Sequence, residues 1–331
     1  ISINQGNSTT AINYYKQVFA NNPETDEAKQ ALDALREIYK DLGRPDEYYS
    51  FVESVPGYGN VSTASKDSTF YESAEAQFNS GRYPQAIEGF TSYLAKYPTG
   101  RNAVNAYFLR GESYAAQKQY DKALKDYAAV IGKGNSKVYP KAAEKASLIA
   151  LNSTKDYAQA FEYARKWEDA AMTEQSRFDA QLVALKAAYQ TNNSVAVSEY
   201  AQKVNASRLA SQDQLAIANF YSGKMAYDKG DYARAYPALQ SVTENTTTDI
   251  MAEAYHYLGQ ILYKQKKYPE AEELITDANK ASAGYDDWIA RNLMLLSDVY
   301  ADQGDKNSAT AALEAVIENY TGDDKNIVPL A

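Results

Sequence analysis

The residue types that could carry out chemistry are few in this sequence. The chain has one histidine, His256, and no cysteine among its 331 residues. One histidine without cysteine cannot supply the ligands of a structural zinc site. A catalytic triad would need His256 beside an activated serine, and the G-x-S-x-G sequence typical of one such serine is absent. The sequence therefore predicts that His256 is a partly exposed residue of a helix.

Carboxylates offer no better candidate for acid–base catalysis. The pairs Asp286–Asp287 and Asp323–Asp324 are adjacent in the sequence and lie in turn-like contexts. Paired acid–base work needs two carboxyl groups that face each other across a cleft, and adjacency does not provide this. Because no set of nucleophile, base and orienting residue is visible, the sequence predicts a protein that is not an enzyme and that has no cofactor and no metal.

Composition narrows the class of partner. The formal net charge is −9 and the isoelectric point is near 4.9. Nucleic acids and anionic membranes are bound by basic surfaces, so neither is an expected partner. No run of about 18 apolar residues occurs, so no transmembrane segment is predicted. The 45% of apolar residues is enough for a substantial core.

A ten-residue pattern recurs along the chain. It reads "GRYPQAIEGF" at 81–90, "KQYDKALKDY" at 118–127, "GDYARAYPAL" at 230–239 and "KKYPEAEELI" at 266–275. The marker tyrosines, at 83, 120, 157, 232 and 268, are 36 or 37 residues apart, except for one double interval that leaves room for a degenerate unit near 193–197. A fixed period of this length indicates a repeat array.

Each unit has the pattern of two helices joined by a short polar turn. In the segment 105–131, apolar residues recur at helical spacing on both sides of "QKQY". Small residues fall where the two helices must approach: Gly111, Gly223 and Gly259 in first helices, and Ala86, Ala123, Ala235 and Ala271 in second helices. Larger side chains there would force the helices apart.

These residues resemble the tetratricopeptide repeat (TPR) family, whose pattern is W-x2-L-G-x2-Y, then A-x3-F and a proline. The unit at 252–285 supplies Tyr255, Leu258, Gly259, Leu262, Ala271 and Ile275 in that register, and the units at 67–100 and 216–249 supply looser matches. The resemblance implies an all-α, right-handed superhelical solenoid of about eight helix-turn-helix units plus a leading half unit. We expect N-terminal units at 1–55 (the first one truncated), a loop or bend at 56–68, and the main array at 69–331.

The spacing between units also resembles that of the long TPR proteins of the bacterial cell envelope, of the outer-membrane assembly and Tol-Pal type. Units average about 37 residues rather than the usual 34, and linkers such as "YPTGRNAVNAY" hold the extra residues. This resemblance implies a bacterial periplasmic or outer-membrane-associated protein, with the cytoplasm as the alternative. The truncated unit at the start and the apolar segment "KNIVPLA" at the end, where a capping helix should be polar, predict a fragment of a longer array.

In TPR proteins, certain first-helix positions line a concave groove. Carried onto this sequence, the resemblance assigns the partner-binding groove to Tyr71, Glu75, Phe78, Phe108, Glu112, Phe220, Lys224, Tyr227, His256, Gln260, Tyr263 and Asp298. Aromatic residues with a few polar groups suit peptide binding. The alternative is that these rings only pack against neighbouring helices. Because Glu75, Glu112 and Asp298 would repel a carboxylate, the acidic C-terminus of a chaperone is a disfavoured ligand.

The TPR resemblance therefore implies a non-enzymatic scaffold that binds a peptide or protein segment in the groove. A second possibility is a structural or accessory subunit of a bacterial envelope complex. A third is a carbohydrate-proximal envelope module that uses its aromatic rings for stacking.

Overall fold

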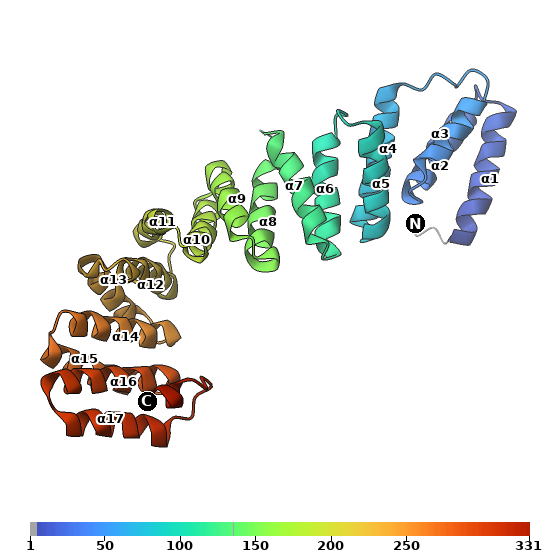
Figure 1. The fold of residues 1–331 in the computed structure, drawn as a ribbon. Helices are drawn as coiled ribbons and strands as arrows, with labels where there is room; N and C mark the ends of the chain where they lie inside the picture. Colours follow the sequence, from blue (N-terminus) through green and yellow to red (C-terminus); the bar gives the residue numbers. More distant parts are fainter. Residues whose placement is uncertain (1–4, 135) are drawn as a thin grey trace. The chain divides into compact units, whose positions relative to one another are not determined.

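The computed structural model describes residues 5–134 and 136–331, and the side chains from Ser8 onward (Figure 1). The described residues are helical and contain no strand. They form two compact units, one up to residue 156 and the other from residue 157. The all-α repeat fold predicted from the sequence is confirmed.

The first unit consists of α1 (Gln5–Asn21), α2 (Asp26–Asp41), α3 (Pro45–Ser54), α4 (Thr63–Asn79), α5 (Tyr83–Lys96), α6 (Ala103–Ala116), α7 (Tyr120–Gly132), α8 (Tyr139–Ile149) and the π-helical turn η1 (Ala150–Thr154). The second unit consists of α9 (Tyr157–Ala170), α10 (Glu174–Gln190), α11 (Ser194–Ala206), α12 (Gln212–Asp228), α13 (Tyr232–Asn245), α14 (Asp249–Lys264), α15 (Tyr268–Ala281), α16 (Asp286–Gln303), α17 (Lys306–Asn319) and α18 (Ile327–Leu330).

Successive helices pack as hairpins within each unit (Figure 1). In the first unit α4 packs on α5 and α6 on α7, and in the second α10 packs on α11, α12 on α13, α14 on α15 and α16 on α17. The degenerate unit expected near 193–197 is the α10–α11 hairpin, whose second helix starts at Ser194. We call α4, α6, α10, α12, α14 and α16 the first helices of their hairpins.

A similar turn joins the two helices of most repeats, and its recurrence matches the regular period. A residue with positive φ recurs every 36–38 residues, at Gly43, Gly81, Lys118, Lys155, Asn192, Gly230, Lys266 and Gly304. In seven of these eight turns, all but that at Lys155, the next residue's N–H bonds to a carbonyl five residues back, as Lys267 does to Leu262 at 2.9 Å. This is the Schellman ending, which satisfies carbonyls that the helix leaves unpaired.

Small residues set the helix crossings, as the sequence predicts. A Cβ added to Gly223 would lie 2.8 Å from Cγ of Leu239, and one added to Gly259 would lie 2.9 Å from Cγ1 of Ile275. The second-helix alanines Ala86, Ala123, Ala235 and Ala271 are fully buried. A larger residue at these positions would separate the helices of its own hairpin.

The segment 56–68, predicted as a loop or bend, is a loop up to the N-cap Ser62, because α4 begins at Thr63. One hydrophobic core runs from Leu35 through Tyr49 to Phe90 across this loop, and the Tyr49 hydroxyl donates to Oγ1 of Thr69 at 2.8 Å. The loop therefore connects elements of one compact unit, and the division between units falls after residue 156.

In the described part of the chain, no helix combines the length and the apolar character needed to cross a membrane.

Candidate functional site

Aromatic rings line the neighbouring first helices of the second unit. Tyr189 of α10 stacks on Tyr221 of α12, with ring centroids 3.9 Å apart and planes within 8°. The ring of Tyr227 of α12 lies 4.8 Å from that of Tyr257 of α14, between centroids. His256, the residue before Tyr257, has its ring centroid 5.6 Å from that of Trp288 of α16. We call this surface the first-helix face of the second unit; its members are Tyr189, Tyr221, Lys224, Tyr227, Glu253, His256, Tyr257, Gln260, Trp288 and Arg291.

The amino group of Lys224 lies among these rings. Its Nζ is 4.9 Å from the centroid of the Tyr257 ring and 5.9 Å from that of Tyr227. The same Nζ pairs with the carboxylate of Asp228, one helical turn further on, at 2.6 Å from Oδ2. With 18% of its side chain exposed, Lys224 is held against the face rather than extended into solvent.

Glu253 lies beside Lys224 and is half-buried. It accepts a hydrogen bond of 3.2 Å from the Tyr257 hydroxyl. Burial raises the pKa of Glu253, although that hydrogen bond and the charge of Lys224 oppose the rise. Burial, together with the negative charge of Glu253, also raises the pKa of Tyr189 to about 12. The hydroxyls of this face are therefore neutral donors at neutral pH.

His256 connects two first helices through polar contacts. Its Nδ1 is 3.0 Å from Oδ1 of Asn292 on α16, and its Nε2 is 2.8 Å from Nε2 of Gln260. An amide oxygen accepts and an amide nitrogen donates, so these contacts fit the neutral ring with its proton on Nδ1. Burial lowers the pKa of His256, which favours the same neutral form. Gln260 in turn accepts from the Tyr227 hydroxyl.

A cavity of about 220 Å³ adjoins this histidine. It brings together three of the predicted groove residues, His256, Gln260 and Asp298, with Arg291 and Leu330. Tyr263, another predicted residue, is half-buried and packs against Tyr268 with centroids 6.0 Å apart. Burial and a hydrogen bond to Asp302 raise the pKa of Tyr263 to about 12.

Two predicted residues of the first unit also meet at one cavity. Phe78 and Glu112 line a space of about 500 Å³ with Tyr83, Lys145 and Leu148. Glu112 accepts a hydrogen bond from the Tyr127 hydroxyl, and Nζ of Lys145 lies 3.7 Å from its other oxygen. This carboxylate is thus already engaged within the chain.

Two residues of the predicted groove, Tyr71 and Phe220, are buried. Their side chains belong to the two cores, with 7% and 4% of each residue exposed. Tyr71 donates its hydroxyl to Glu75 at 2.7 Å. Phe108 is half-buried and faces Tyr127 at 6.1 Å. The reason is the helical register: these positions point at the second helix of their own hairpin rather than outward.

Several members of the face were not among the residues predicted from the sequence. Tyr221 and Tyr257 directly follow the selected positions 220 and 256. Tyr189 lies in the degenerate unit, and Trp288 starts the last hairpin. The signal that could have identified the tyrosines is the recurrence of Tyr at 189, 221 and 257, at intervals of 32 and 36 residues.

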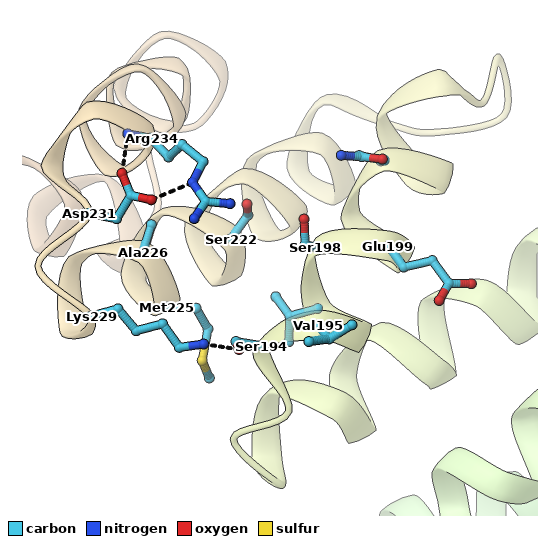
Figure 2. A pocket seen from close by; sticks show the side chains of 12 residues that line it. Ser194, Val195, Ser198, Glu199, Ser222, Met225, Ala226, Lys229, Asp231 and Arg234 are labelled. Atoms are coloured by element: carbon cyan, nitrogen blue, oxygen red, sulfur yellow. Dashed lines mark hydrogen bonds and ion pairs between the residues drawn. The ribbon is translucent and has the colours of Figure 1, made fainter.

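A further cavity, of about 490 Å³, lies between α11, the end of α12 and the start of α13 (Figure 2). Lys229 bonds to Ser194 at one end of it, and Asp231 pairs with Arg234 at the other. Val195, with 78% of its surface exposed, provides an apolar wall. None of the residues predicted to form the site from the sequence lines this cavity.

Comparison with known proteins identifies the repeats. Family models described as tetratricopeptide repeat match residues 71–137 and 250–322. The C-terminal part of a TPR repeat-containing protein from Cytophaga hutchinsonii is similar in structure: it has 20% identity and a TM-score of 0.53, and the match covers 78% of this chain and 98% of that one.

The Naa15/Naa10 assembly bound to HypK-THB is also similar, with 14% identity, a TM-score of 0.50, and coverage of 96% of this chain and 44% of that chain. The comparison with curated proteins finds no match. The two segments matched by the family models are tetratricopeptide repeats, and the chain folds as a TPR solenoid.

Proposed function

We propose that this chain is a protein-interaction scaffold without chemistry of its own, and that the first-helix face of its second unit takes an extended or helical segment of a protein partner. TPR proteins generally mediate protein–protein interactions. The observation that carries the proposal is the row of half-buried rings from Tyr189 to Trp288, contributed by four neighbouring first helices.

The chemistry of this face suits a protein segment. Tyrosine and tryptophan rings offer large rigid contact areas at low entropic cost, and their polar atoms can bond to a peptide backbone. Because Tyr227, His256 and Gln260 hold one another in place, little side-chain ordering would remain to oppose binding. The face is therefore better prepared for a ligand than a set of free side chains would be.

The experiment is a selection of displayed peptides against the full chain, followed by hydrogen exchange of the chain with a selected peptide. We expect slower exchange in α12 and α14, and in the adjoining turns of α10 and α16. If selection yields no specific binder, or protection appears only in the second helices α11, α13 and α15, the proposal is wrong.

The cavity of Figure 2 favours a second function, that of a structural subunit of a larger complex. Exposed Val195 of α11 and buried Met225 of α12 line this cavity together with residues of α13, and no ring of the first-helix face is among its lining residues. A partner seated there would hold the array itself. Cross-linking from a cysteine placed at Val195 in a native extract would capture such a partner, whereas a cysteine at exposed Lys186 of α10 is the matched control.

A place in the bacterial periplasm or at the outer membrane, with the cytoplasm as the alternative, remains part of the proposal. So does the carbohydrate-proximal alternative, in which the same rings would stack on sugars. Fractionation of cells that express the full-length gene product tests the location. A glycan array tests carbohydrate binding, and this alternative requires that the chain binds a glycan and that Tyr257→Ala abolishes the binding.

A further inference from the structure

A group of five residues on the first-helix face surrounds one ammonium group. It consists of Lys224, Tyr227 and Asp228 of α12, and of Glu253 and Tyr257 of α14; we call it the Lys224 cage. Its two rings lie 4.9 and 5.9 Å from Nζ of Lys224. A cation over the face of a tyrosine is attracted by the negative charge of the ring face, so the cage already acts as a cation site for a residue of the chain.

The charges of the cage do not balance. It holds two carboxylates and one ammonium group, and Lys224 is paired with Asp228. None of the ion pairs found in the described residues includes Glu253, whose hydrogen-bond partner is the Tyr257 hydroxyl. A half-buried carboxylate without a cation is unfavourable. Burial accordingly raises the pKa of Glu253.

The neighbouring cations do not fill this role. Arg291 of α16 is paired with Asp324 at 2.5 Å. Nζ of Lys264 of α14 lies 5.7 Å from the centroid of the Tyr227 ring, but no ion pair of the described residues joins Lys264 to a carboxylate of the cage. Among the described residues, Lys224 is the cation that approaches both rings and pairs with a carboxylate of the cage, and Glu253 remains available to a positive group that arrives from outside.

We propose that the Lys224 cage binds an arginine side chain of the partner segment, and that Lys224 occupies the ring faces only while that segment is absent. This inference rests on the function proposed above, and it names the chemistry of one contact. Arginine fits because its planar guanidinium stacks on aromatic faces and forms two parallel hydrogen bonds to a carboxylate. Glu253 is that carboxylate, and Tyr257 and Tyr227 are the faces. No covalent step is involved.

The inference can be tested with a small probe. Nα-acetyl-arginine amide is titrated into the isotope-labelled full chain, and the backbone NMR signals of α12 and α14 are followed. Nα-acetyl-citrulline amide, which has the same shape without the charge, is the matched ligand. We expect arginine amide to shift signals around Asp228 and Glu253, and citrulline amide to bind at least about tenfold more weakly, since cation–π and charge-assisted contacts are lost.

Substitutions sharpen the test. Lys224→Met removes the competing ammonium group, so it should tighten binding of arginine amide by about tenfold, a change of 1.4 kcal/mol. Glu253→Gln should weaken binding by a similar factor. Lys186→Met, at an exposed position of α10, should leave the affinity for arginine amide unchanged. Circular dichroism verifies that each variant is folded, and Lys224→Gln replaces Lys224→Met if the latter is not.

Equal affinity for the two amides, or unchanged affinity in the folded Lys224 variant, would overturn the inference. The probe is an amino-acid derivative and not a segment, so this failure would leave the proposed scaffold function intact. Failure of the peptide selection, in contrast, would count against the scaffold function whatever the amides do.

Discussion

The first helices of the two units carry similar residue types, but their polar side chains make different contacts. In the first unit, Tyr71 donates to Glu75 of its own helix, and Glu112 accepts from Tyr127 of its own hairpin. In the second unit, Tyr227 of α12 donates to Gln260 of α14, and His256 of α14 contacts Asn292 of α16.

The first-unit hydrogen bonds named above stay within one helix or hairpin, whereas those of the second unit connect neighbouring first helices. Contacts within a hairpin stabilise that hairpin, and Glu112 is engaged in this way by the Tyr127 hydroxyl of α7. Contacts between neighbouring first helices create a continuous face, and one carboxylate on that face, Glu253, lacks an ion-pair partner among the described residues. Repeat position alone therefore does not decide which unit binds a partner.

The largest expected effect concerns how the first unit holds its hairpins. Asp126 of α7 forms two hydrogen bonds with Arg110 of α6, at 2.7 and 2.8 Å, and is nearly fully buried. Asp126→Ala leaves Arg110 buried without its partner, which should cost about 3–5 kcal/mol of unfolding free energy. Denaturant unfolding measures this, with exposed Asp121→Ala as the control. A cost below that of the control would show that the pair does not hold the hairpin.

The second-largest expected effect is the loss of stability on overpacking a helix crossing, and it should be equal in the two units. Ala123 of α7 and Ala271 of α15 occupy the same repeat position and are fully buried. Replacing either by leucine overpacks its helix crossing and should cost about 1–3 kcal/mol. Exposed Lys125→Ala should stay within about 0.5 kcal/mol. A melting temperature that is unchanged in Ala271→Leu alone would mean that the second unit does not share the crossing geometry of the first.

A smaller effect is expected at the turns. Lys118 and Lys266 adopt φ of 57° and 59°, whereas the turns at Gly81 and Gly230 use glycine. A side chain in the left-handed region costs roughly 1 kcal/mol, which glycine avoids. Lys118→Gly and Lys266→Gly should therefore raise the melting temperature by a few degrees, and Gly230→Ala should lower it. If Lys266→Gly destabilised the chain, the lysine side chain would have a role beyond the turn.

The smallest effect concerns pH. Because the pKa of Glu253 is raised in the folded chain, its contribution to stability is present below the ordinary value of 4.5 and is lost as pH rises through the folded value. Glu253→Gln should therefore raise the melting temperature near neutral pH and leave it almost unchanged in acid. A melting temperature that falls at neutral pH would show that the carboxylate stabilises the face.

The fold was predictable because its determinants are local. Three features recur with one period in most repeats: a turn residue, a tyrosine two places later and an alanine at the helix crossing. The local sequence of a repeat therefore specifies its own hairpin. The loop at 56–68 was predicted as a boundary from its glycine and serine content, but composition does not report that Tyr49 and Thr69 bond across it.

The candidate site was less predictable because side-chain direction depends on helical register. A shift of one residue, about 100° around a helix, separates buried Phe220 from half-buried Tyr221. His256, Gln260 and Lys224 were identified from repeat position. Glu253 was not identified, because its importance comes from the lack of an ion-pair partner, and only the packing of the face reveals this.

The central claim is that the face of the second unit, rather than that of the first, takes the partner segment. The direct measurement is the equilibrium affinity of one selected peptide for the wild-type chain, Tyr257→Ala and Phe108→Ala. We predict that Tyr257→Ala loses more than about 1 kcal/mol of binding free energy, as a hot-spot residue does, and that Phe108→Ala binds as the wild type does. Loss of binding in Phe108→Ala with full retention in Tyr257→Ala would contradict the account.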